Sequence, residues 1–192
     1  KLKDRLPHMS EDEMLELLAT DGMLVVMVGI SAEVPSGVSD LTADSVRITD
    51  FALRLFQASK TEGENSLVSP LSVLCALAMT ANGAVGETRT QMEAVLGMTA
   101  EELNEYLYTY MRNLPQGEKY KLNLANSIWF TDDDGFTVND AFLQTNADWY
   151  GAGLYSAPFD SGTRDEINRW VSDHTKGMIP EILDQVSEDA LM

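Results

Sequence analysis

The sequence has few of the residues that build catalytic and metal centres. It contains one cysteine, Cys75, and two histidines, His8 and His174, among 192 residues. A single cysteine excludes an intramolecular disulfide and any zinc site with several cysteine ligands. Two histidines leave little material for histidine-based catalysis.

Basic residues are also scarce. Thirteen Lys and Arg residues face 31 Asp and Glu residues, so the formal net charge is −18. This charge repels the phosphates of nucleic acids and the surface of an anionic membrane. We therefore expect neither nucleic acid nor a membrane as a partner.

Long apolar runs are absent. The longest one extends from Met23 to Ile30, whereas a membrane-spanning helix needs roughly 20 apolar residues. The run has the length of a signal-peptide core, but Ser10–Asp21 before it is acidic where a signal peptide is basic. We interpret the run as a strand-like segment or junction and see no export signal.

The sequence is rich in helix patterns. Ser69 and Pro70 suit the N-cap and first position of a helix whose body, Leu71–Ala81, is apolar nearly all round. Such a helix lies inside a larger core, and we expect Gly83 to close it in a left-handed conformation. Thr99 and Glu102 form a capping box before an acidic helix that reaches about Leu114. Further helices are predicted over Ser10–Asp21, Ile48–Phe56, Glu87–Leu96, Asn139–Tyr150 and Thr163–Lys176.

Two segments have strand character. Lys121–Phe130 alternates, which places apolar side chains on one face, and Gly153–Phe159 is a second, shorter strand. Ser31–Asp44, rich in Ser, Gly, Pro and Asp, is predicted to be a linker.

Candidate reactive groups have simpler explanations. Cys75 lies within the apolar helix, where burial raises a thiol pKa, so we expect a small hydrophobic residue and no nucleophile. His174 beside Asp173 is interpreted as an exposed or packed histidine. Asp132–Gly135 is interpreted as a turn and not as a calcium site. A calcium loop starting at Asp132 needs a glutamate ligand at its twelfth position, and that position is Leu143. We find no catalytic, metal-binding or cofactor-binding residues, which favours a binding or structural protein over an enzyme.

Several separated motifs resemble the serpin superfamily, in order and in spacing. They are Asn65–Ser72 with the apolar helix behind it, Gly83, Gly86–Met92, Leu122–Phe130, Tyr155–Phe159, Ile167–Val171 and Thr175–Pro180. The resemblance covers about residues 46–192. It implies an α+β fold, the N-terminal half of a serpin: helices A to F with the first strands of sheet A, truncated before the reactive loop.

The resemblance implies a suicide inhibitor of serine or cysteine proteases. In such an inhibitor the protease acylates a reactive loop, which then inserts into sheet A of a metastable fold. Asn65, Ser69, Pro70 and Ser72 would belong to the shutter, where sheet A parts. The N-cap role of Ser69 is compatible with this. Asn168, Trp170 and Thr175 would seat helix F.

The sequence also departs from the family pattern. It stops at Met192, where a serpin enters the third strand of sheet A, so we expect no reactive-site bond in this chain and no inhibition by the fragment alone. A non-inhibitory serpin acting as an interaction protein remains the alternative. The acidic Thr99–Leu114 helix lacks a basic face, so no heparin-type activator is expected. The family resemblance suggests an extracellular protein, and the lack of disulfides fits a bacterial origin as well as an archaeal or intracellular one.

The first 25 residues resemble an internal piece of the arsenate reductase/Spx family, which has a thioredoxin-like fold. That family's basic residue and Arg-Pro are replaced by Val26-Met27-Val28, and its active cysteine is not present, so a redox enzyme is disfavoured. We expect a remnant over residues 1–25, a linker over 26–45 and a partial serpin domain over 46–192.

Overall fold

The computed structural model describes residues 26–38, 40–115, 117–120, 122–187 and 190–192. They fall into two compact units. The helical unit comprises Gly29–Ser127 and Val138–Gly153. The sheet unit comprises residues 26–28, Ile128–Thr137 and Leu154–Met192. The predicted helix over Ser10–Asp21 and the resemblance of residues 1–25 lie outside the described residues.

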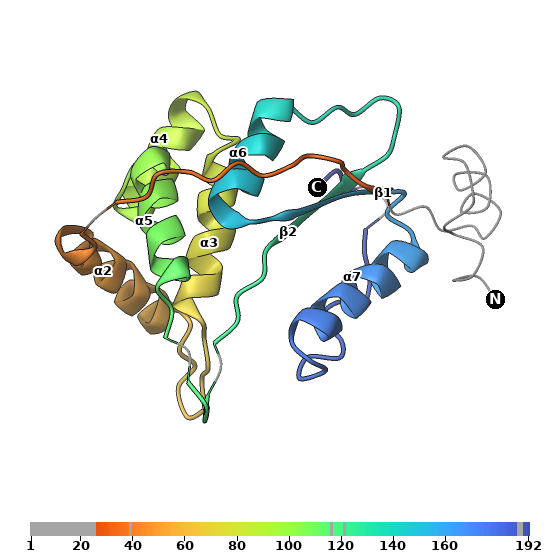
Figure 1. Ribbon diagram of the computed structural model, residues 1–192. Helices are drawn as coiled ribbons and strands as arrows, with labels where there is room; N and C mark the ends of the chain where they lie inside the picture. The colour runs from red at the N-terminus through yellow and green to blue at the C-terminus, as the bar shows by residue number, and fades with distance from the viewer. Residues whose placement is uncertain (1–25, 39, 116, 121, 188–189) are drawn as a thin grey trace. The chain divides into compact units, whose positions relative to one another are not determined.

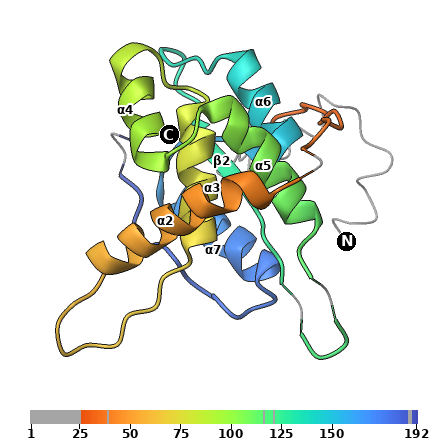
Figure 2. The ribbon, with the colours of Figure 1, turned by 90° about the vertical axis from the view of Figure 1, so that its left-hand side faces the viewer.

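The helical unit is organised around one central helix. Its helices are α2 (Thr42–Ala58), α3 (Pro70–Ala81), α4 (Gly86–Leu96), α5 (Ala100–Arg112) and α6 (Asp140–Tyr150). Helix α3 packs against all four of the others, as Figures 1 and 2 show. Most of its apolar surface is thereby covered. A stripe of three residues spaced four apart, Ser72, Ala76 and Thr80, is exposed.

The capping box predicted from the sequence is confirmed, whereas the predicted glycine C-cap of α3 is not. Both bonds of the Thr99–Glu102 capping box are present, and Gly97 closes α4 with a φ of +82°. The prediction for Gly83 is wrong, because Asn82 caps α3 in the right-handed conformation. A Cβ at position 83 would lie 3.1 Å from two ring carbons of Phe142, so the glycine allows close approach of α6.

Other helices begin or end a few residues away from the positions predicted from the sequence. Helix α2 begins at Thr42, inside the expected linker, and Asp40 accepts a hydrogen bond of 2.8 Å from the Thr42 N–H. Helix α5 ends at Arg112 and not at Leu114. Helix α7 (Ser161–His174) begins two residues before Thr163, because Asp160 accepts the Thr163 N–H at 2.9 Å and acts as the N-cap.

The sheet has three strands, β1 (Val26–Met27), β2 (Ser127–Thr131) and β3 (Gly153–Ala157), in the order β1-β3-β2. Strand β1 pairs antiparallel with β3, so that Met27 lies opposite Tyr155.

Both predicted strands are shorter than expected. The first is regular only from Ser127. The Gly153 N–H bonds to the Asn126 carbonyl at 2.9 Å, so β3 begins opposite this point. The second strand stops at Ala157 because the buried Phe159 adopts a φ of +52°, which is incompatible with a strand.

Within the sheet unit, α7 is joined to β3 through an aromatic contact. The Trp170 Nε1 donates a hydrogen bond of 3.0 Å to the Tyr155 hydroxyl, and the Tyr155 ring stacks on Trp129 with centroids 4.3 Å apart. Trp170 therefore helps to seat α7.

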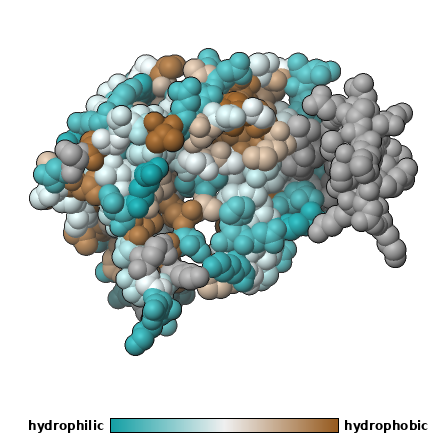
Figure 3. Space-filling view, in the orientation of Figure 1, coloured by the Kyte–Doolittle hydropathy of each residue, from teal (hydrophilic) through white to brown (hydrophobic). Residues whose placement is uncertain are grey.

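Exposed large apolar side chains are scattered. Figure 3 shows them in several separate places on the face that it presents, with polar residues between them. Examples lie on α2 and in the segment after α7: Leu53, Phe56, Met178 and Ile182. Apolar residues dispersed in this way are normal for a protein surface. No described helix has the length and apolar character needed to cross a membrane.

Candidate functional site

The serines assigned to the shutter by resemblance lie together at the start of α3. The Ser69 Oγ is 2.8 Å from the Ser72 Oγ and accepts a hydrogen bond of 3.4 Å from the Ser72 N–H. Pro70 occupies the first helical position, and Asn65 is exposed in the loop between α2 and α3. The N-cap role of Ser69 is confirmed. A shutter role for these four residues stays a prediction.

The residues assigned to helix F organise the chain that follows α7. Asn168 is buried, and its Oδ1 accepts the N–H groups of Ile182 and Leu183 at 2.8 and 3.0 Å. Its Nδ2 donates to the Leu183 carbonyl at 2.8 Å. Thr175 caps α7, and its Oγ1 accepts the Ile179 N–H at 3.1 Å. These two side chains fasten the return segment to the helix.

The six predicted site residues thus form two groups. Asn65, Ser69, Pro70 and Ser72 belong to the helical unit, whereas Asn168 and Thr175 belong to the sheet unit. Ser69 and Ser72 are in direct contact, whereas Asn168 and Thr175 bind different residues of the return segment.

The helical unit also contains a polar network that was not predicted from the sequence. The Asn82 Nδ2 donates to the Oδ1 atoms of Asn104 and Asn146, both at 3.1 Å, and the Asn104 Nδ2 returns a bond of 3.0 Å to Asn82. The Tyr150 hydroxyl donates to the Asn104 Oδ1 at 2.7 Å. Burial raises the pKa of Tyr150 well above its ordinary value, so the hydroxyl stays protonated and donates.

A signal for this network is present in the sequence. Asn104 shares the helical face of Ala100, Leu103 and Leu107, and Asn146 shares the face of Leu143, Ala147 and Tyr150, at i, i+3, i+4 and i+7. An asparagine on the apolar face of a helix needs buried hydrogen-bond partners, and the two positions could have been recognised on that basis.

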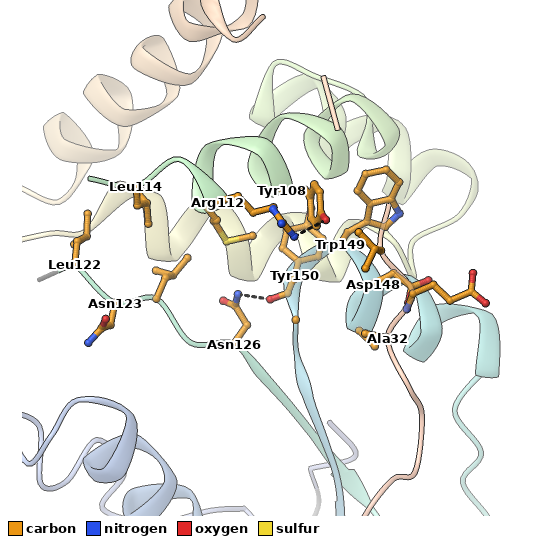
Figure 4. A pocket seen from close by; sticks show the side chains of 16 residues that line it. Ala32, Tyr108, Arg112, Leu114, Leu122, Asn123, Asn126, Asp148, Trp149 and Tyr150 are labelled. Atoms are coloured by element: carbon orange, nitrogen blue, oxygen red, sulfur yellow. Dashed lines mark hydrogen bonds between the residues drawn. The ribbon is translucent and has the colours of Figure 1, made fainter. Parts of the chain in front are cut away.

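A pocket of about 490 Å³ opens beside the C-terminal half of α5. It is lined by residues of α5, the end of α6 and two connecting segments, and Figure 4 shows its side chains. Tyr108 and Trp149 meet edge-on with centroids 5.8 Å apart. The Arg112 Nη1 donates 2.9 Å to the Tyr108 hydroxyl, and the Asn126 Nδ2 donates 3.0 Å to the Tyr150 carbonyl.

The candidate reactive groups are not arranged for catalysis. Cys75 is fully buried, and burial raises the pKa of its thiol to about 12. His174 is exposed, stacks on Trp170 and lies 2.7 Å from the Trp170 carbonyl through its Nδ1. Among the described residues, no group of His, Cys, Asp and Glu side chains is placed to hold a metal ion.

Comparison with known proteins identifies the family. The family model described as Serpin (serine protease inhibitor) matches residues 46–192. The leukocyte elastase inhibitor of Equus caballus is 34% identical over 142 residues, which cover 70% of this chain and 37% of the relative. The neuroserpin of Mus musculus is 29% identical over 171 residues, which cover 82% of this chain and 41% of the relative.

A solved structure supports the same family assignment. The native state of Tengpin, a thermophilic serpin, superposes with a TM-score of 0.81 at 45% identity, covering 88% of this chain and 44% of that one. The chain thus spans about two fifths of the length of the proteins that it matches. The α+β fold predicted from the motifs, that of an N-terminal serpin half, is confirmed, and the chain belongs to the serpin family.

Proposed function

We propose that the chain supplies the N-terminal part of a serpin that inhibits a serine protease by inserting its reactive loop into sheet A. The observation that carries the proposal is the continuous family match over residues 46–192. A relative that is 34% identical is a leukocyte elastase inhibitor, so an elastase is the first protease to test. In this role the protein is an inhibitor and not an enzyme.

In this proposal, residues 46–192 form a partial serpin domain that contributes most of α2, helices α3 to α7 and strands β2 and β3. Residues 26–45 connect it to the remnant over residues 1–25. The reactive loop lies outside the 192 residues, so the chain alone forms no complex with a protease. The shutter residues Ser69 and Ser72 and the residues that hold the return segment, Asn168 and Thr175, act when the sheet opens.

The test uses the complete product of the reading frame that contains this chain. Incubated with leukocyte elastase, the complete product should form an SDS-stable covalent complex, and residues 1–192 alone should form none. Elastase whose active-site serine has been blocked is the control, because acylation requires that serine.

The same experiment distinguishes an inhibitory serpin from the alternative, a non-inhibitory one. A complete product that elastase-, trypsin- and chymotrypsin-like proteases cleave without forming a complex would overturn the proposal and support a non-inhibitory serpin that acts as an interaction protein. Detection of the protein in culture medium would test the extracellular location suggested by the resemblance.

A further inference from the structure

Arg112 differs from the other arginines that the structure describes. Each of the others forms an ion pair with a carboxylate: Arg47, Arg54, Arg89, Arg164 and Arg169. Arg112 is the one described arginine without such a partner. Its guanidinium carbon lies 5.3 Å from the centroid of the Tyr108 ring, and one nitrogen donates to the Tyr108 hydroxyl. Because a guanidinium has five N–H donors, donors are left for an outside acceptor.

This arginine lies on the wall of the pocket beside α5. Figure 4 shows its side chain next to Tyr108 and near Tyr150. Much of the remaining wall is apolar or aromatic: Met111, Leu114, Leu122, Leu124 and Trp149. A pocket of about 490 Å³ is within the range of small-molecule sites, which combine apolar walls with a few polar groups that fix orientation.

The acidic groups on the wall do not neutralise Arg112. The Asp148 Oδ1 accepts two hydrogen bonds of 2.7 Å, from the Glu33 N–H and from the Gln144 Nε2. Glu33 is exposed, and neither carboxylate forms an ion pair with the guanidinium. The pocket therefore presents one cationic group that forms no ion pair with any carboxylate among the described residues.

We propose that this pocket binds a small amphipathic carboxylate. The headgroup pairs with Arg112, since guanidinium and carboxylate match in shape and charge. The apolar body lies against Leu114, Leu124 and Trp149. An apolar body is required, because a chain with a net charge of −18 repels a simple anion at long range, and burial of apolar surface supplies the compensating free energy.

The probe is decanoate. Decanol is its uncharged counterpart, and acetate is a carboxylate without the long apolar chain. Binding to the 192-residue chain is measured by titration calorimetry and by the fluorescence of Trp149, with Trp149→Phe assigning the optical signal. We expect decanoate to bind about fivefold more tightly than decanol, the preference that one partly exposed ion pair supplies, and acetate not to bind.

Arg112→Gln should remove the preference for decanoate and leave decanol binding unchanged. Leu124→Ser should weaken both ligands. Arg169→Gln, which removes an arginine already paired with Glu166, is the matched control and should keep the preference. Circular dichroism checks the fold, and Arg112→Lys, which keeps the charge, should retain part of the preference. An unchanged preference in Arg112→Gln, or no binding of decanoate to the folded chain, would overturn the proposal.

Discussion

The Tyr150 hydroxyl donates a hydrogen bond of 2.7 Å to the Asn104 Oδ1, from the last residue of α6 to the buried face of α5. The same oxygen accepts a bond of 3.1 Å from Asn82, which caps α3. One amide oxygen thus connects three helices that are distant in the sequence. In a buried network whose polar groups all have hydrogen-bond partners, the bonds strengthen one another. Removing one side chain leaves its partners buried without a hydrogen bond, which costs the free energy of their desolvation.

Asn104→Ala should therefore destabilise the helical unit strongly. The substitution leaves the Tyr150 hydroxyl and the Asn82 Oδ1 without the partner that Asn104 supplies, and we expect a loss of about 3 kcal/mol in the free energy of unfolding. Urea denaturation followed by circular dichroism measures it. Asn123→Ala, at an exposed position, is the control and should cost less than about 0.5 kcal/mol. Similar losses in the two variants would contradict this account.

The helices could be predicted because their signals are local. Ser69, Thr99 and Gly97 act within one turn of the helix that they begin or end, so the sequence alone carries the information. The position of α3 at the centre followed from its apolar body.

The strand lengths and the pocket could not be predicted, because they depend on partners far away in the chain. Strand β2 becomes regular only where β3 lies beside it. The Asn82–Asn146 bond spans 64 residues, and the pocket collects side chains from residues 32 to 151. The residues of the return segment were named from resemblance, but the three bonds of Asn168 follow from the structure alone.

Gly83→Ala should test why a glycine follows α3. The new Cβ would lie 3.1 Å from the Cδ2 and Cε2 of Phe142, and such overpacking costs roughly 1–2 kcal/mol. Phe142→Leu in the same chain should recover part of the loss, because the shorter side chain gives room. Thermal unfolding of the single and double variants gives the coupling energy. Additive losses would show that the two positions are not in contact.

Ser69 can be tested for its N-cap role without reference to the shutter. Ser69→Ala removes the acceptor for the Ser72 N–H and should cost about 1 kcal/mol, whereas Ser69→Asp keeps an acceptor and should cost less. Urea denaturation separates the two. An equal loss in both variants would mean that the hydroxyl contributes in another way, such as the 2.8 Å contact with the Ser72 Oγ.

Asn168→Ala should free the segment that follows α7. The substitution removes three hydrogen bonds to Ile182 and Leu183, so their amides should exchange with solvent faster while those in the body of α7 change little. Hydrogen exchange with mass spectrometry measures this. The matched control is Asn139→Ala at the start of α6, which removes a cap and not the return contacts. Unchanged exchange at Ile182 and Leu183 would show that other contacts hold the segment.

Cys75 predicts how stability depends on alkaline pH. Burial raises its pKa from 9.0 to about 12. Below pH 9 the thiol is protonated in both states and has no influence. Above it the unfolded chain loses this proton while the folded chain keeps it until about pH 12, so stability falls as pH rises, by up to about 1.4 kcal/mol per pH unit.

Cys75→Val keeps a buried apolar side chain without a titrating group. Its unfolding free energy, measured in urea at a series of pH values, should fall less steeply than that of the unsubstituted chain above pH 9, the ordinary pKa of the thiol. Parallel curves would show that the thiol does not titrate differently in the two states and would contradict this prediction.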